Sequence, residues 1–496
     1  MKRYLSIVFA ILACCVFGRT HSLTLWRGET LVDLLPDTAR FDEGPLPDIP
    51  GLTVKVFALN LVAYAKDAAS LDRSFRLDRL DSMEKGPGLR HCVEITADRD
   101  MKPGTYVYGP LTLEIKKSQM PTPKERRVYL DLWQHPWAVS SYFKVEPFSD
   151  EHFALMKKVL APLATAGQRA LTVTILDEPW NHQCNVAYHS MIGRVRHDDG
   201  SWSYDWTNFD KYVAMGDEAG IGPDIACYTM CPWGNQCVYE NDKGECQVMV
   251  CKAGTPEFEA FWGPFLSAFA AHLKEKGWYE RTVIAMDERS PEEVKAICDF
   301  VAARAPGLRI AMAGNIAPSK FQGCKIDIYS QIISFVTPEF LEEAAKRRKD
   351  GFVTTYYVCC GPWRPNTFMT SPLAESFWLG AYPGVSGLDG FLRWAWNSWS
   401  DVSHSDASVA PFPAGDSLLI YPPASKNEEP CMSLRFCELR NGLNASEKLR
   451  ILGEKAENAA KIDALRRYFS PKDAMDGKVN MQEARKAVQD FVNSVE

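Results

Sequence analysis

Residues 282–313, TVIAMDERSPEEVKAICDFVAARAPGLRIAMA, contain the pattern that decides the fold. The apolar runs at 282–286 and 309–313 have the composition of buried strands, and the segment 291–305 between them has the spacing of an amphipathic helix. Strands that alternate with helices of this length form the units of a parallel sheet. The stretch therefore predicts an α/β domain.

The same alternation continues on both sides of this unit. Further strand-like runs lie at 128–133, 171–176, 224–228, 327–330, 353–358 and 390–396, and further helix-like runs at 150–163, 208–215, 256–276, 338–349 and 372–379. Eight strands with mostly helical crossovers predict a central (β/α)8 TIM-type barrel over residues 127–425. A doubly wound sheet is the alternative, because the link between the fifth and sixth strands is short. No Gly-rich phosphate loop follows any strand, which disfavours that alternative.

The regions that flank the predicted barrel have different patterns. Residues 23–126 contain short alternating segments broken by Gly and Pro, such as LTVKVFALNL at 52–61 and GTYVYGPLTLEI at 104–115. Period-two alternation at this spacing predicts an N-terminal antiparallel β-sandwich. Residues 426–496 are charged and have helical spacing, which predicts a C-terminal helical segment. The chain is therefore expected to be multidomain.

The N-terminus has the layout of a secretory signal peptide. Lys2 and Arg3 precede an apolar run at 5–17, and the run is too short for a spanning helix. We expect residues 1–22 to be a signal peptide and the protein to be exported, whether periplasmic, secreted or lipid-anchored. Residues 11–14, ILAC, approximate a lipobox, so membrane contact is expected only if Cys14 is lipidated. The sequence leaves the oligomeric state unknown.

Composition narrows the class of partner. The net charge is −7 and no Lys/Arg block is present, so nucleic acid is not an expected partner. The 14 Trp, 18 Tyr and 25 Phe suit the apolar faces of sugars, although they also fill cores. Five of the 15 Cys cluster within 227–251, where we expect one or two disulfides in an irregular loop. Zinc is the alternative, but no paired C-x-x-C is present, so no metal or cofactor is predicted.

Polar and aromatic residues follow the predicted strands. In a TIM barrel the active site lies where the C-terminal ends of the strands meet. The fourth strand runs directly into Asp287 and Glu288, the predicted catalytic pair. The other strand ends supply the predicted substrate-binding residues, which are Trp133, His135, Trp180, Tyr228, Trp233, Asn315, Tyr329, Tyr357, Trp396 and Asn397.

Two Asp-Glu pairs compete for the catalytic role. Adjacent acids cannot easily flank a glycosidic bond as independent acid and nucleophile, but they suit a reaction in which the 2-acetamido carbonyl of the substrate attacks. Asp287 would then polarise the acetamido N–H, and Glu288 would protonate the leaving oxygen and later deprotonate water. The second pair, Asp177 and Glu178, precedes a proline, where acidic residues often cap a turn. We therefore favour the first pair.

Several segments resemble glycoside hydrolase family 123. The resemblance includes HLKEKGWYERTVIAMDER (272–289), LWQHPW (132–137), DWTNFDKYV (205–213), CYTMCPW (227–233), GLDGFLRWAWN (387–397), GDSLLIY (415–421) and SLRFCELRNG (433–442). It implies a β-N-acetylgalactosaminidase that acts by substrate-assisted catalysis, with a β-sandwich in front of the barrel. It also implies that Asp287 matches the acetamido-stabilising Asp of the family and Glu288 its acid/base Glu.

The chain departs from the family pattern at the motif Asp177-Glu178-Pro179-Trp180 and in its Cys-rich insertion. The substrate that the resemblance implies is a carbohydrate with terminal β-linked N-acetylgalactosamine, as in glycans or glycosphingolipids. The alternatives are a β-N-acetylglucosaminidase or another glycosidase on the same barrel, and a non-catalytic surface carbohydrate-binding protein.

Overall fold

The computed structural model describes residues 21–39, 41, 45–67, 70, 72–83 and 88–494. By contacts the chain divides into one unit of Met1–Asn60, Leu80–Thr122 and Asp490–Glu496, and a second of Leu61–Arg79 and Pro123–Gln489. Most of the expected signal peptide, including Cys14, lies outside the described residues, and its last two positions begin the first strand. Within the described part of the chain, no helix is both long and apolar enough to cross a membrane.

The N-terminal strands form two sheets, as the alternating pattern predicted. One sheet has the order β1-β7-β6 and the other β2-β5-β3-β4. The buried faces of both sheets share one apolar core, which includes Leu25, Val93, Ile95 and Leu113. Strand β5 pairs antiparallel with β2 and β3, and β6 pairs antiparallel with β7, whereas β1 and β7 run parallel. The strands are β1 (His21–Arg27), β2 (Thr30–Leu34), β3 (Leu52–Tyr64), β4 (Ser74–Ser82), β5 (Arg90–Ala97), β6 (Gly104–Tyr108) and β7 (Leu111–Gln119).

The second unit contains an eight-stranded parallel sheet in the order β8-β19-β18-β17-β16-β15-β12-β9. Each strand pairs with the next strand of the barrel in parallel register, so all eight C-terminal ends lie on one side. The predicted barrel is therefore confirmed. Its strands are β8 (Tyr129–Leu132), β9 (Ala170–Thr174), β12 (Asp224–Tyr228), β15 (Thr282–Met286), β16 (Arg309–Gly314), β17 (Ile328–Ile332), β18 (Val353–Val358) and β19 (Gly390–Arg393).

The barrel closes between β8 and β9 largely through two glutamine side chains. A single backbone bridge joins Leu130 to Gln168. The Gln168 side chain accepts the N–H of Leu132 at 3.0 Å, and the Gln134 side chain accepts the N–H of Thr172 at 2.9 Å. These amides satisfy buried backbone groups that a regular strand ladder would otherwise pair.

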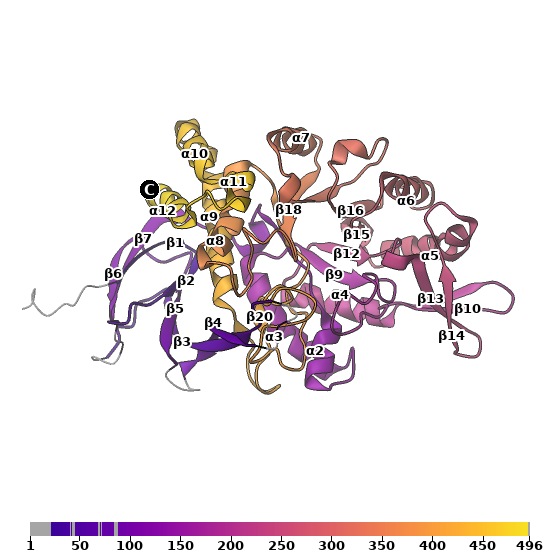
Figure 1. The fold of residues 1–496 in the computed structure, drawn as a ribbon, viewed down its shortest axis with the longest axis horizontal. Coiled ribbons are helices and arrows are strands. Elements are labelled where there is room, and N and C mark those ends of the chain that lie inside the picture. The colour runs from indigo at the N-terminus through magenta and orange to yellow at the C-terminus, as the bar shows by residue number, and fades with distance from the viewer. Residues whose placement is uncertain are drawn as a thin grey trace, which may run out of the picture. The chain divides into compact units, whose positions relative to one another are not determined.

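Helices line the outside of the barrel, and Figure 1 shows α5, α6 and α7 along one side of the sheet. The link between β16 and β17 has only a 3-10 turn at Pro318–Lys320, in line with the short connection in the sequence. Helices α8 and α9 pack closely because glycines meet at their crossing, where a Cβ on Gly442 would collide with the backbone oxygen of Phe377. The helices are α2 (Pro136–Phe143), α3 (Asp150–Ala166), α4 (Thr207–Ala219), α5 (Pro256–Glu275), α6 (Pro291–Arg304), α7 (Pro338–Lys349), α8 (Leu373–Ser386), α9 (Leu434–Gly453), α10 (Ala459–Leu465), α11 (Pro471–Met475) and α12 (Met481–Ser494).

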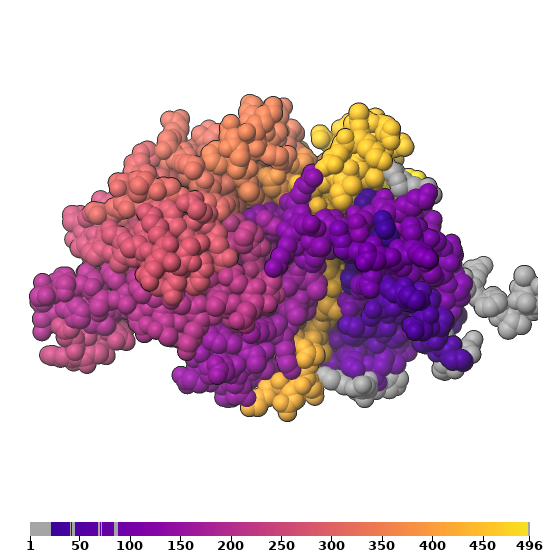
Figure 2. Space-filling view, turned by 180° about the vertical axis from the view of Figure 1, so that it is seen from behind, coloured from indigo at the N-terminus to yellow at the C-terminus, as the bar shows by residue number. Residues whose placement is uncertain are grey.

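The predicted Cys-rich loop is instead part of a small ordered sheet. Strands β10 (Gly193–Arg196), β11 (Trp202–Asp205), β13 (Gln236–Asn241) and β14 (Cys246–Val250) form a sheet in the order β11-β10-β13-β14. This sheet lies at one end of the second unit, where Figure 2 shows the residues around 200–250 as a projection. The expected disulfides are wrong: every cysteine in the described part of the chain is a free thiol. Backbone pairing, rather than covalent cross-links, holds this insertion together.

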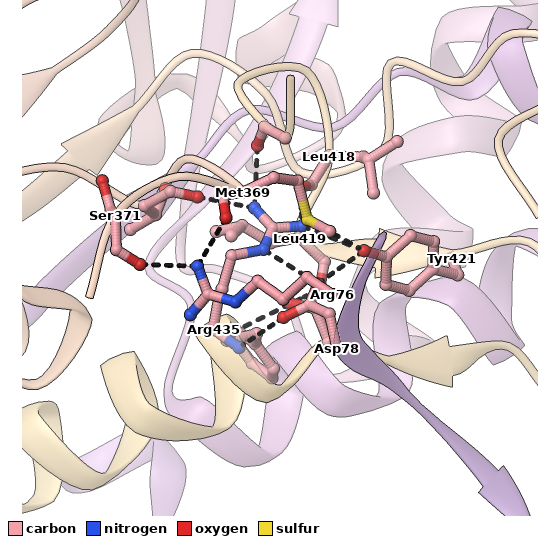
Figure 3. A network of polar contacts seen from close by, with 12 residues as sticks. Arg76, Asp78, Met369, Ser371, Leu418, Leu419, Tyr421 and Arg435 are labelled. Atoms are coloured by element: carbon pink, nitrogen blue, oxygen red, sulfur yellow. Dashed lines mark hydrogen bonds and ion pairs between the residues drawn. The ribbon is translucent and has the colours of Figure 1, made fainter. Parts of the chain in front are cut away.

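A buried polar network fixes the segments that follow the last strands (Figure 3). The guanidinium of Arg435 on α9 donates to Asp78 at 2.9 Å, and it also donates to the backbone oxygens of Thr367, Gly415 and Leu418. The Tyr421 hydroxyl donates to the same carboxylate, while Arg76 donates to the oxygens of Met369 and Ser371. Because Arg435 and Asp78 are almost fully buried, removal of either partner would leave an unpaired internal charge.

Candidate active site

The carboxylates Asp287 and Glu288 lie between the end of β15 and the start of α6. Ser290 caps the helix, and its side chain and that of Glu293 form a capping box with the first-turn backbone. Pro291 at the first helical position fixes the direction in which the helix leaves the turn. The motif DERSPEE therefore ends the strand and starts the helix within a few residues, which places both acids at the C-terminal rim of the barrel.

Asp287 is held by an indole. The Trp233 Nε1–H donates to its Oδ2 at 3.1 Å, and the Arg289 guanidinium lies 4.4 Å from the centre of the same indole ring. Arg289 is itself fixed, because it donates twice to the backbone oxygen of Cys231, at 2.9 and 2.8 Å. Burial raises the pKa of Asp287 above its ordinary value, while the hydrogen bond from Trp233 and the charge of Arg289 oppose that shift.

Glu288 receives two hydrogen bonds from neighbouring strands. The Tyr357 hydroxyl on β18 donates to its Oε1, and Asn315, just after β16, donates from Nδ2 to its Oε2 at 3.1 Å. Burial and the adjacent carboxylates raise the pKa of Tyr357, so the phenol stays protonated and remains a donor. The carboxyl of Glu288 therefore has a defined orientation.

The two acids open into one aromatic cavity of about 220 Å³. Trp133 and Trp180 form part of its wall, with their ring centres 5.1 Å apart, and the buried Tyr228 packs behind both rings at 4.6 and 5.2 Å. On the other side, Trp394 packs against Phe412 at 4.9 Å. The lining residues are Trp133, Trp180, Gln183, Cys184, Tyr188, Trp233, Asp287, Glu288, Ala313, Tyr357, Cys359, Cys360, Leu392, Trp394 and Phe412.

The structure brings seven of the predicted residues together at this cavity. Six of them line it, and Asn315 contacts Glu288 directly. The six are Trp133, Trp180, Trp233, Tyr357, Asp287 and Glu288.

The other five predicted residues lie away from the cavity wall. Tyr228 is behind the tryptophans, and Tyr329 turns its hydroxyl to the backbone oxygen of Ile316. Trp396 is fully buried and donates to the oxygen of Val159 at 3.1 Å. The prediction of substrate contact from these side chains is corrected to a packing role.

His135 and Asn397 form a structural pair beside the first strand. The amide of Asn397 accepts from the backbone N–H of His135 and donates to its oxygen, both at 3.0 Å. Burial lowers the pKa of His135 to about 3, so the ring is neutral at physiological pH. Its ring stacks on Tyr188, which lines the cavity, at 3.6 Å between centres. These two residues therefore support the wall without forming it.

The side chains of the competing pair, Asp177 and Glu178, bond to other residues of the loop that follows β9. Glu178 accepts the backbone N–H groups of His182 and Tyr188 at 2.9 and 3.1 Å. Asp177 pairs with His189 at 3.3 Å and raises the pKa of that histidine. This is the capping role that acidic residues before a proline often have, and neither acid lines the cavity.

Several lining residues could not be identified from strand ends alone. Tyr188, Gln183 and Cys184 come from the long connection after β9, which has no periodic pattern. Trp394 immediately follows β19, but the sequence pattern does not show that Trp394, and not Trp396 two positions later, lines the cavity. Its Nε1–H donates to the buried Asp416 at 3.0 Å, and this bond fixes the indole at the cavity.

The arrangement suits acid–base chemistry on a small ring with apolar faces. Within the described ranges, no three His, Cys, Asp or Glu side chains group as ligands of a metal ion. A parallel barrel that presents paired carboxylates among tryptophans at its C-terminal rim has the architecture of a glycoside hydrolase.

The protein belongs to glycoside hydrolase family 123, whose catalytic domain matches residues 133–452. Among solved structures, the chain is similar to a family 123 glycoside hydrolase from Clostridium perfringens, described in a study of glycolipid glycan hydrolysis. The TM-score is 0.82 at 23% identity, over 96% of this chain and 94% of that one.

More distant structural matches include a GH39 enzyme from Xanthomonas axonopodis pv. citri, with a TM-score of 0.38 at 12% identity, over 67% of this chain and 68% of that one. They also include a maltogenic alpha-amylase from Thermotoga neapolitana, with a TM-score of 0.36 at 10% identity, over 64% and 76% of the two chains. A search of curated proteins gives no match.

Proposed function

We propose that this family 123 hydrolase is a retaining exo-β-N-acetylgalactosaminidase that uses the 2-acetamido group of its substrate as nucleophile. One observation carries the proposal: Asp287 and Glu288 are adjacent, share a single cavity and have different hydrogen-bond partners. Two neighbouring acids of this kind can act on two different atoms of one sugar. They are too close in the chain to lie on opposite faces of its ring.

The first step forms an oxazolinium intermediate. The acetamido oxygen attacks C1, the bond from C1 to the glycosidic oxygen breaks, and Glu288 gives its proton to the departing oxygen. Asp287 accepts the acetamido N–H, which orients the group and stabilises the positive charge that develops on it. The hydrogen bonds from Tyr357 and Asn315 keep the Glu288 carboxyl at the glycosidic oxygen during this transfer.

The second step restores the enzyme. Glu288, now a carboxylate, takes a proton from water, and the resulting hydroxyl attacks C1 from the side the leaving group vacated. The bond from C1 to the acetamido oxygen breaks, so the product keeps the β configuration. The surrounding tryptophan rings exclude bulk water and offer apolar surface to the C–H face of the sugar and to the acetamido methyl.

The size of the cavity supports an exo-acting enzyme. At about 220 Å³ the cavity is smaller than the roughly 300–1,000 Å³ of typical ligand pockets, so it suits one terminal sugar better than an internal stretch of a glycan. The study of the Clostridium perfringens relative concerns glycolipid glycan hydrolysis, which supports glycans of glycolipids as the substrate class. The choice of terminal β-N-acetylgalactosamine rests on the resemblance of the sequence motifs to the family. The leader-like residues 1–22 support export as part of the same proposal.

A panel of aryl glycosides tests the function. The wild type should hydrolyse the β-N-acetylgalactosaminide, and Glu288→Gln should lose activity by about three orders of magnitude or more, as expected when a positioned acid and base is removed. Asp287→Asn should lower kcat with acetamido sugars. Asp177→Asn is the matched control, because that acid also follows a barrel strand but pairs with His189 and does not line the cavity.

Other results would redirect the assignment. Comparable turnover of the plain β-galactoside would remove the acetamido mechanism. Preference for the β-N-acetylglucosaminide would change the sugar but keep the chemistry. Sugar binding without any turnover would indicate a carbohydrate-binding protein instead of an enzyme.

A further inference from the structure

The wall of the cavity contains two adjacent thiols that the proposed reaction does not use. Cys359 and Cys360 directly follow β18, and both line the same cavity as the carboxylate pair. Tyr357, the donor to Glu288, lies on β18 two residues before Cys359. A group attached to either sulfur would therefore occupy space beside the catalytic acids.

The two thiols differ in their exposure. Cys360 is exposed and Cys359 is half-buried, with its Sγ directed to the backbone oxygen of Gly361 at 3.5 Å. The side chains interact with each other, and the hydrogen bond from Cys359 lowers the pKa of Cys360 to about 7. The same contact, together with burial, raises the pKa of Cys359. Because the thiolate is the nucleophile, Cys360 is the reactive member of the pair.

Charged groups near the pair come from other elements. Asp416 raises the pKa of Cys360 and Arg393 lowers it, and these two residues form a fully buried ion pair at 2.7 Å. Their opposing charges largely offset one another, so Cys359 remains the main cause of the shift. A third thiol, Cys184, also lines the cavity, but burial raises its pKa to about 12 and keeps it protonated.

We propose that Cys360 is a thiol-modification site in the wall of the sugar cavity, and that a mixed disulfide formed there with a small thiol blocks entry of the substrate. The Cys360 thiolate attacks one sulfur of a low-molecular-weight disulfide, such as oxidised glutathione. A new S–S bond forms at Cys360, and the original S–S bond breaks. The departing thiolate takes a proton from water. The Cys360 sulfur is oxidised, the departing sulfur is reduced, and excess free thiol reverses the reaction.

The consequence follows from the small size of the site. The cavity of about 220 Å³ is smaller than the roughly 300–1,000 Å³ of typical ligand pockets. A tripeptide thiol attached at its wall cannot share that space with a substrate. Modification should therefore lower activity by exclusion, without changing the carboxylates themselves.

The test treats the full-length protein with oxidised glutathione and identifies the modified cysteine by peptide mass spectrometry. We expect an adduct on Cys360 and none on Cys184, with kcat/KM lowered by about tenfold or more and restored by dithiothreitol. Cys360→Ser should lose this sensitivity relative to its own untreated rate. Cys246→Ser is the matched control, because that exposed thiol lies in β14 and does not line the cavity.

A second measurement isolates the role of Cys359. The rate of alkylation of Cys360 by iodoacetamide should have a midpoint near pH 7 in the wild type. In Cys359→Ala, which cannot donate a hydrogen bond, that midpoint should move to higher pH. An unmodified Cys360, or a Cys360 adduct with unchanged activity, would overturn the proposal.

The activity readout rests on the proposed function, and the labelling readout does not. If the untreated protein has no glycosidase activity, the proposed function fails on that result alone. Occlusion is then judged with a sugar that the protein is shown to bind, by whether that sugar slows the labelling of Cys360, and no slowing at saturating concentration would overturn it.

Discussion

The hydrogen bond between Trp233 and Asp287 offers the sharpest test of the site. Trp233→Phe removes the Nε1–H that donates to Asp287 Oδ2 at 3.1 Å but keeps an aromatic ring beneath Arg289. A hydrogen bond to a charged group contributes about 1.5–3 kcal/mol, so kcat/KM should fall by about tenfold to a hundredfold. The cation–π contact should survive, since phenylalanine also presents a ring face to a guanidinium.

The pH profile gives this prediction a definite sign. Burial raises the pKa of Asp287 and the Trp233 N–H opposes that shift, so loss of the N–H should raise the pKa further. In the proposed reaction Asp287 acts as a carboxylate, and protonation removes its activity. The acid limb of kcat/KM should therefore move to higher pH.

The assay is a pH series of kcat/KM on an aryl β-N-acetylgalactosaminide, with thermal unfolding as a check on folding. Trp394→Phe is the control, because that cavity tryptophan donates to Asp416 and not to the catalytic pair. It should lower activity without moving the acid limb. An acid limb that stays in place in Trp233→Phe would refute the assigned role of Asp287.

Three further predictions concern the site and the fold. Tyr357→Phe removes one donor to Glu288 and should lower kcat by about tenfold with little change in KM, as measured by steady-state kinetics. Asp131 is buried, one of its oxygens has no hydrogen bond, and burial raises its pKa to about 7. The protonated carboxyl of Asp131 therefore contributes fully to stability in acid. This contribution is lost as the pH rises to about 7, by up to about 1.4 kcal/mol per pH unit. In urea unfolding, the free energy of unfolding of Asp131→Asn should rise relative to that of the wild type as the pH increases to about 7. A difference between the two proteins that stays constant with pH would contradict the raised pKa of Asp131. Gly442→Ala should destabilise the protein by about 1–3 kcal/mol, because its Cβ would meet the oxygen of Phe377, and an unchanged urea midpoint would argue against that packing.

Local patterns were sufficient for the barrel and for the position of the proposed catalytic pair at a strand end. The predicted strands at 282–286 and 353–358 coincide with β15 and β18, since a buried parallel strand is a continuous apolar run. The motif from Met286 to Glu293 contains the strand end, both acids and the helix cap within eight adjacent positions. Such features depend on neighbours in the chain, and a sequence displays them directly.

The choice between adjacent aromatic residues depended on the fold. Tyr356 and Tyr357 are equivalent in the sequence, but successive strand residues face opposite sides of the sheet. Tyr356 packs on α8 through its bond to Leu379, whereas Tyr357 reaches Glu288. Trp394 at the cavity and Trp396 in the core lie two positions apart after the end of β19, so strand alternation does not distinguish them and the path of the chain beyond the strand decides their places.

By itself, the sequence determined the class of fold, the order of its strands and the position of Asp287 and Glu288 at a strand end. Only the tertiary structure decided that Tyr188, Cys360 and Phe412 join those acids, and that the clustered cysteines remain thiols. The reason is physical: strand and helix periodicity is encoded between residues a few positions apart. The cavity is formed by loops distant in the chain, and packing alone sets their paths.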